Sequence, residues 1–123
     1  MDARPEGVVT GVWHDGAVPG PIVVGRPREC SIADALAVIG DRWSLLIVRE
    51  LGFGVTRFTD IRSNTGAPRE ILTARLRKLE AEGVIIRTPY QQRPARFEYS
   101  LTDAGRQLGP VLQTLRGWGE AFA

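Results

Sequence analysis

Basic side chains gather in the stretch from Pro68 to Glu82, which has the periodicity of a helix. At 100° per residue, Thr73 and Arg77 lie opposite a stripe of three leucines. Arg69 projects from the first turn, where backbone N–H groups also favour phosphate. An arginine guanidinium is a planar fork of donors that suits phosphate and the edge of guanine. This face is either a solvated surface or a surface that binds a polyanion, and the residue types favour the polyanion.

The positive charge of the chain is concentrated in one segment. The whole sequence has a net charge of +2, which by itself indicates no partner. Between Arg57 and Tyr99, nine Arg and Lys residues stand against five Asp and Glu residues, an excess of four, and eight of the nine are arginine. Such a segment is typical of a surface that binds nucleic acid, provided that the fold presents it on one side.

The elements around this segment predict a helix–turn–helix followed by a two-stranded β wing. Apolar residues recur at helical spacing before Gly83 and at a spacing of two after it. In chain order, we expect helices over 31–39, 42–51, 57–64 and 68–82, strands over 84–90 and 95–101, and a last helix from 103 onward. The predicted fold is therefore mainly α with a small β wing, a winged helix–turn–helix.

Local signals fix the ends of these elements. Ser31, Asp41 and Thr102 are expected to cap three helices. Pro68 is expected at the first helical position, where its missing N–H costs nothing, and Pro110 is expected to bend the last helix. Two further cations flank the basic face: we expect Arg75 and Lys78 to pair with Glu82 and Glu70.

Residues 1–29 differ from the rest in composition. Four prolines and five glycines exclude a helix, and Asp15–Gly16 is a hairpin-type turn signal between two apolar runs. We interpret this part as a Pro/Gly-rich N-terminal arm, which is either a loose hairpin docked on the body or on a partner, or a flexible tail. No role is assigned to Trp13, and His14 is expected at the surface. Residues 30–123 form the predicted winged-helix domain for DNA binding and dimerisation.

Several classes of protein are disfavoured. The sequence has no Gly-rich phosphate loop, no cluster of metal ligands and no nucleophile–base pair, so we expect neither an enzyme nor a bound cofactor or metal. No apolar run approaches the roughly 18 residues of a membrane helix. A single cysteine and the absence of a visible secretory signal favour the cytoplasm.

Six stretches of the sequence, in this order, resemble one family of bacterial regulators. They are Cys30, IGDRWSLLIVREL (39–51), RFTDI (57–61), ILTARLRKLEAEGVIIRTPY (71–90), FEYSLTDAGRQLGPVL (97–112) and WGE (118–120). The chain resembles the HxlR-type winged-helix transcriptional regulators, which are related to the MarR regulators. The resemblance implies a repressor or activator that binds double-stranded DNA. It also implies a homodimer formed through the first and last helices, which fits the wide apolar face of the last helix.

Seven residues are the candidates for contact with DNA. Arg77 is the best candidate for bidentate contact with guanine, and Thr73 for contact with a base or a thymine methyl group. Arg93 and Arg96 on the wing either contact the DNA backbone or minor groove, or keep a two-stranded edge soluble. The full set is Arg57, Thr59, Arg69, Thr73, Arg77, Arg93 and Arg96.

Cys30 and two tryptophans are the candidates for regulation by an effector. Cys30 precedes the first helix and lies two residues from Arg28, and both features favour the thiolate. The resemblance adds that redox-responsive relatives sense electrophiles at this position; the alternative is an inert, buried thiol. Trp43 and Trp118 are interpreted as core and dimer packing, with a binding site for a small ligand as the alternative.

One function of another class stays open, namely a winged-helix module that binds a protein and not specific DNA. Salt separates the two interpretations. DNA binding weakens steeply with salt because counterions are released, whereas binding through the apolar last helix would not.

Overall fold

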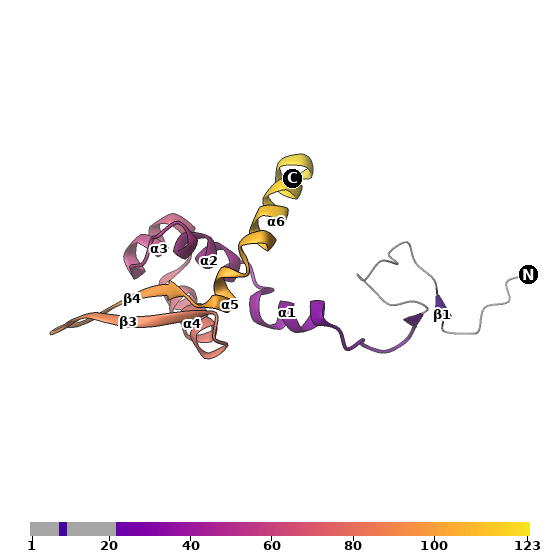
Figure 1. Ribbon diagram of the computed structural model, residues 1–123, viewed down its shortest axis with the longest axis horizontal. Coiled ribbons are helices and arrows are strands. Elements are labelled where there is room, and N and C mark those ends of the chain that lie inside the picture. The colour runs from indigo at the N-terminus through magenta and orange to yellow at the C-terminus, as the bar shows by residue number, and fades with distance from the viewer. Residues whose placement is uncertain (1–7, 10–21) are drawn as a thin grey trace, which may run out of the picture. The chain divides into compact units, whose positions relative to one another are not determined.

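The computed structural model describes Val8–Val9 and residues 22–123, with side chains from residue 24 onward. Two compact units are distinguished, and the second comprises Asp34–Ala123. The described elements, in chain order, are β1 (Val8–Val9), β2 (Ile22–Val23), α1 (Ser31–Ile39), α2 (Ser44–Gly52), α3 (Phe58–Thr65), α4 (Arg69–Ala81), β3 (Ile85–Gln92), β4 (Ala95–Leu101), α5 (Asp103–Arg106) and α6 (Gly109–Phe122) (Figure 1). The predicted fold class, mainly α with a small β wing, is confirmed.

The first unit contains a short antiparallel pairing. Val8 lies opposite Val23 and Val9 lies opposite Ile22. This pairing is that of a hairpin, one of the two interpretations of the N-terminal arm. The predicted turn at Asp15–Gly16, and with it Trp13 and His14, lies outside the described residues.

The core of the second unit lies between α2, α3, α4 and the start of β3. The apolar side chains that form it are each at most 7% exposed: Ile47, Val48, Leu51, Ile61, Ala67, Leu72, Leu76, Leu79, Val84 and Ile85. Three of them are the leucine stripe of α4, so the side of α4 that faces the core is as predicted. Because each such side chain stabilises the fold by roughly 1.5–3 kcal/mol when buried, the stripe fixes which face of α4 remains outside.

A tight turn connects the two helices of the helix–turn–helix. Gly66 ends α3 in the left-handed conformation, with φ 76°, which glycine adopts without strain. The hydroxyl of Thr65 donates to the carbonyl of Ile61 over 2.7 Å and accepts from the N–H of Ala67 over 3.3 Å. Pro68 occupies the cap position and not the first helical position, since its ψ of 144° is extended. The helix therefore begins one residue later than predicted.

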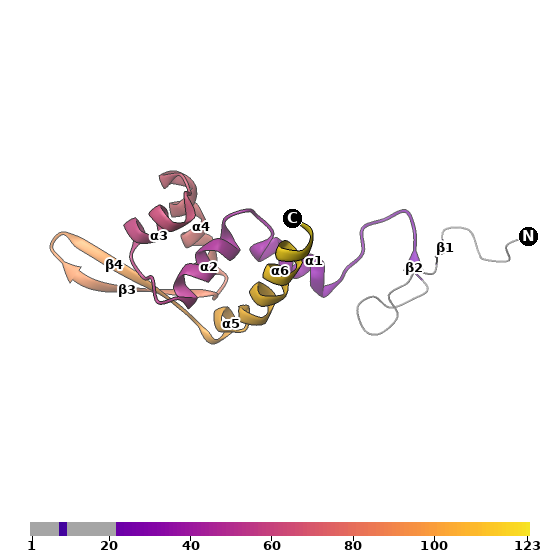
Figure 2. The same cartoon turned by 90° about the horizontal axis from the view of Figure 1, so that it is seen from above.

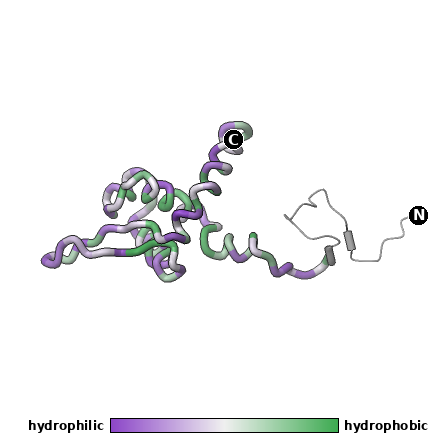
Figure 3. Tube along the Cα trace, viewed as in Figure 1, coloured by the Kyte–Doolittle hydropathy of each residue, from purple (hydrophilic) through white to green (hydrophobic). Residues whose placement is uncertain are grey.

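The wing is an antiparallel hairpin with a shift of register between Pro89 and Gln91, and its first strand extends two residues further than predicted. Gln92 lies opposite Ala95, so only Arg93 and Pro94 form the turn, and the peptide bond between them is cis. The polar residues Gln91 and Gln92 belong to the strand because cross-strand pairing overrides their low intrinsic preference for it. The hairpin extends beyond the helices (Figure 2), and its tip is hydrophilic (Figure 3).

The prediction of a single bent helix at the C-terminal end is wrong. The chain forms the short α5, capped by Thr102, whose hydroxyl accepts from the N–H of Gly105 over 3.1 Å, and then the separate α6. Pro110 lies in the first turn of α6, where no helical N–H is required, so it belongs to the start of a new helix. The cap at Thr102 is as predicted.

Candidate nucleic-acid interface

Two cations of α4 hold the helix against the preceding helices. The Nε of Arg75 lies 3.0 Å from Oδ2 of Asp41, and Nζ of Lys78 donates to the carbonyl oxygen of Ala37 over 2.7 Å. The expected pairing with Glu82 and Glu70 is therefore wrong, because the flank of α4 that carries these cations faces α1 and the start of α2. Both residues position α4 and leave its other cations to face outward.

Asp41 is the anchor of this arrangement. Its carboxylate accepts from the N–H groups of Trp43 (2.9 Å) and Ser44 (3.0 Å) and from the hydroxyl of Ser44. Because α2 begins at Ser44 and Trp43 occupies its cap position, Asp41 binds these groups from the turn before the helix and not from the predicted cap position. Partial burial acts to raise the pKa of this carboxyl. The hydrogen bonds from Ser44 and Trp43, together with the charge of Arg75, outweigh burial and lower the pKa below its usual 3.8. Asp41 is consequently ionised at neutral pH, and the pairing with α4 is present there.

The outer face of α4 carries the three predicted residues. Arg69 and Arg77 are exposed and Thr73 is half-buried. The hydroxyl of Thr73 donates to the carbonyl of Arg69 over 2.9 Å, which leaves its methyl group and its acceptor lone pairs for a partner. The guanidinium of Arg69 lies 5.5 Å from the ring centroid of Phe58. Among the described residues, no ion pair engages Arg77, so its donors are available.

A pocket of about 220 Å³ lies between α4 and the wing. Its lining comes from α3, α4 and both strands of the hairpin: Phe58, Arg69, Thr73, Leu76, Arg77, Glu80, Arg87 and Tyr99. The pocket brings the three predicted residues of α4 together with Arg87 of β3, which was not among the predicted contacts. The signal that could have identified Arg87 is its place in a predicted strand that directly follows the basic helix.

The remaining predicted contacts lie apart from this pocket. Arg57 precedes α3 in extended conformation, and its guanidinium lies 3.8 Å from the ring centroid of Tyr90 on the wing. Thr59 is exposed in the first turn of α3, whereas Arg93 and Arg96 are exposed at the tip of the hairpin. The predicted contacts thus form three groups: the outer face of α4, the start of α3 and the tip of the wing.

Comparison with known proteins agrees with this geometry. The family model described as HxlR-like helix-turn-helix matches residues 38–123. The chain belongs to the HxlR-like helix-turn-helix family. An HTH-type transcriptional regulator of Mycobacterium tuberculosis is 46% identical over 92 residues, which are 75% of this chain and 58% of that protein. The chain thus spans little more than half the length of this relative.

Two further comparisons cover more of the other protein. The HTH-type transcriptional regulator YdeP of Bacillus subtilis is 38% identical over 94 residues, which are 76% of this chain and 73% of YdeP. The redox regulator HypR in its oxidised form superimposes with a TM-score of 0.65 at 35% identity, covering 76% of this chain and 98% of HypR. These similarities confirm the resemblance to the HxlR-type regulators that the sequence predicts.

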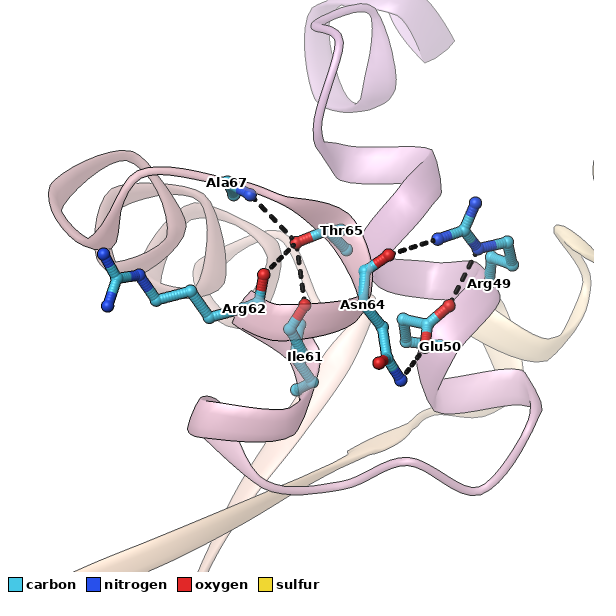
Figure 4. A network of polar contacts seen from close by, with 7 residues as sticks. All are labelled: Arg49, Glu50, Ile61, Arg62, Asn64, Thr65 and Ala67. Carbon is cyan, nitrogen blue, oxygen red and sulfur yellow. Dashed lines mark hydrogen bonds and ion pairs between the residues drawn. The ribbon is translucent and has the colours of Figure 1, made fainter.

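A buried carboxylate of α2 holds α3, the first helix of the helix–turn–helix, in place (Figure 4). Glu50 of α2 is only 4% exposed, and its two oxygens accept from Nε of Arg49 and from Nδ2 of Asn64, each over 2.8 Å. Arg49 also donates to the carbonyl of Asn64 over 3.2 Å. A buried charge of this kind is stable only when paired, so the network ties α3 to α2. Sequence reasoning missed it because the partners are 14 residues apart.

The candidate regulatory residues lie at separate places. Cys30 is exposed, and its Sγ accepts from the N–H of Ala33 over 3.3 Å, so Cys30 and not Ser31 occupies the cap position of α1. Trp43 is half-buried against the core, with the guanidinium of Arg42 4.7 Å from its ring centroid. Trp118 is 60% exposed. Neither tryptophan lines the pocket between α4 and the wing, and a ligand site at these residues stays a prediction.

The described part of the chain contains neither a membrane-spanning helix nor a cluster of metal ligands. No helix there is long and apolar enough to cross a membrane. Within the same part of the chain, no group of three or more His, Cys, Asp or Glu side chains could hold a metal ion.

Proposed function

We propose that this HxlR-like chain binds specific DNA sequences as a homodimer on an inverted-repeat operator. The observation that carries the proposal is the outer face of α4, where Arg77 is exposed and without an ion pair in the described structure, beside Arg69 and Thr73. In a winged helix–turn–helix, the second helix of the pair enters the major groove, where an arginine reads guanine through two hydrogen bonds. The wing then lies beside the DNA backbone.

The homodimer is supported by apolar side chains that the single chain leaves uncovered. On α6, Val111, Leu115, Trp118 and Phe122 are exposed along one face, and Ile32 and Leu36 of α1 are exposed as well. A two-fold dimer places two copies of α4 about 34 Å apart, so the operator is expected to be an inverted repeat with half-site centres one helical turn apart. Selection of bound fragments from random DNA tests both the binding and the symmetry.

Replacement of Arg77 and of Arg93 is expected to separate base recognition from phosphate contact. Arg77→Ala is expected to cost about 1–3 kcal/mol of binding free energy on the selected operator and to relax the preference at one base pair in each half-site. Arg93→Ala is expected to weaken binding to operator and random duplex alike and to flatten the salt dependence. The measurement is fluorescence anisotropy with both duplexes at several salt concentrations.

Equal losses on operator and random duplex for both variants would contradict the role of Arg77. A parent chain whose partner binding is insensitive to salt would instead favour the protein–protein module, since counterion release accompanies every phosphate contact.

Redox control through Cys30 is a second proposal, supported by the exposure of its thiol and by the similarity to the redox regulator HypR. We expect a quinone or hypochlorite to change the operator affinity of the parent and to leave Cys30→Ser unchanged. Cys30 is the only cysteine of the sequence, so an oxidised thiol must be resolved by a second protomer or by a small thiol. If the parent and Cys30→Ser respond alike, the thiol is structural, and the effector binds elsewhere.

A further inference from the structure

The pocket between α4 and the wing has a positive lining that the proposed base contacts do not explain. Three arginines, Arg69, Arg77 and Arg87, face one carboxylate, Glu80, which leaves an excess of two positive charges. These side chains come from two different elements, α4 and β3, that only the fold brings together. The charge therefore belongs to the space between the helix and the wing, beyond the exposed face of α4 itself.

Duplex geometry suggests what this space holds. A major groove and the neighbouring minor groove are separated by one sugar–phosphate backbone. If α4 lies in the major groove and the wing lies toward the next minor groove, that backbone crosses the space between them. Resting on the proposed function, we infer that the pocket between α4 and the wing binds a backbone phosphate, with Arg87 as a phosphate-contacting residue and Glu80 as the carboxylate that limits the affinity.

The surroundings of Arg87 suit this role. Its guanidinium lies 4.3 Å from the ring centroid of Phe97, so one face of the group is supported while its edge can still donate. The Nε of Arg87 is 3.8 Å from Oε2 of Glu80, and both side chains are more than one third exposed. A pair of this length and exposure is weak, so Glu80 can release Arg87 to a phosphate.

The other walls of the pocket favour a phosphate over a larger ligand. Burial raises the pKa of the Tyr99 phenol above its usual 10.0, so this hydroxyl stays protonated at neutral pH and can donate a hydrogen bond. The volume of about 220 Å³ lies below the roughly 300–1,000 Å³ that small-molecule sites enclose. Cationic and hydroxyl donors in a small space are the chemistry that recognises one phosphate group.

The test compares Arg87→Ala and Glu80→Gln with the parent on a random-sequence duplex, which reports phosphate contact alone. Arg87→Ala is expected to reduce the slope of log affinity against log salt by about 0.9 per protomer bound, the value for one lost phosphate contact. Glu80→Gln is expected to tighten binding by roughly two- to fivefold, the range for one exposed charge pair. A purely structural residue would not give a gain of affinity.

Arg116→Ala is the matched control, because Arg116 is an exposed arginine on α6, outside the basic segment. It is expected to leave the salt slope on the random duplex unchanged. Thermal unfolding of all three variants verifies that each is folded before binding is compared.

Three outcomes overturn the inference, and they are distinguishable. If the parent binds no duplex, the proposed function fails and the phosphate site fails with it. If the parent binds but Arg87→Ala keeps the full salt slope, only the phosphate site fails. In the third outcome, Arg87→Ala keeps the full salt slope, and calorimetry shows that the parent binds benzoate whereas Arg87→Ala does not. The pocket is then a site for a small organic anion.

Discussion

A chain that carries Trp118→Asp is expected to be a monomer and to bind the selected operator at least about 100-fold more weakly than the parent. Trp118 is 60% exposed on α6, and its ring centroid is 5.5 Å from that of Phe122, which is 75% exposed. These rings form the end of the apolar face assigned to the dimer. A carboxylate placed there would have to be buried against a second copy without a partner, which is strongly unfavourable.

The loss of operator affinity follows from the loss of the second half-site. When two copies of α4 are linked in one dimer, the second binding event is intramolecular. Avidity then raises the affinity by a factor of about 10²–10⁴. Sedimentation at micromolar concentration and operator titration measure the two consequences separately.

Gln113→Asp is the control for charge, since at 100° per residue Gln113 lies on the side of α6 opposite Trp118. It is expected to leave the chain dimeric with nearly parental affinity. If Trp118→Asp remains a dimer, the interface lies elsewhere on the chain; if it becomes a monomer with unchanged operator affinity, one chain suffices for binding.

Gly105→Ala is expected to lower the free energy of unfolding by about 3 kcal/mol, the upper part of the usual range for overpacking. A Cβ at this buried position of α5 would lie 2.2 Å from the carbonyl oxygen of Val84 and 3.0 Å from a methyl group of Leu101. The carbonyl cannot retreat easily, because it accepts a hydrogen bond from the N–H of Thr102 over 3.1 Å. The clash would thus push α5 away from the base of the wing.

Gly109→Ala is the matched control, since apart from its chain neighbours and the adjoining backbone of its own helix no atom lies within 4 Å of the position that its Cβ would occupy. It is expected to stabilise the chain by about 0.4–1 kcal/mol, because alanine restricts the unfolded chain more than glycine does. Denaturant unfolding of both variants gives the two changes. Equal changes at the two sites would show that α5 does not pack as closely as these contacts require.

Much of the architecture follows from local sequence signals. The leucine stripe of α4 and the cap at Thr102 each depend on residues within about one or two helical turns, so spacing and residue type suffice to predict them. The errors lie where local signals compete. Pro110 is compatible with a bend and with a new helix, and Gln91 is compatible with a turn and with a strand. Only packing and cross-strand pairing resolve these alternatives.

The candidate site depends more on the tertiary structure than the fold does. The sequence alone determined that α4 carries its basic residues outside an apolar stripe, and it identified Arg69, Thr73 and Arg77 on the outer face. It did not determine that Arg75 pairs with Asp41 and Lys78 with the carbonyl of Ala37, or that Arg87 lines the pocket from β3. A charged side chain selects its partner by distance in space, because the strength of a charge pair depends on separation and burial. Those two quantities exist only once α1, α2, α4 and the wing have packed together.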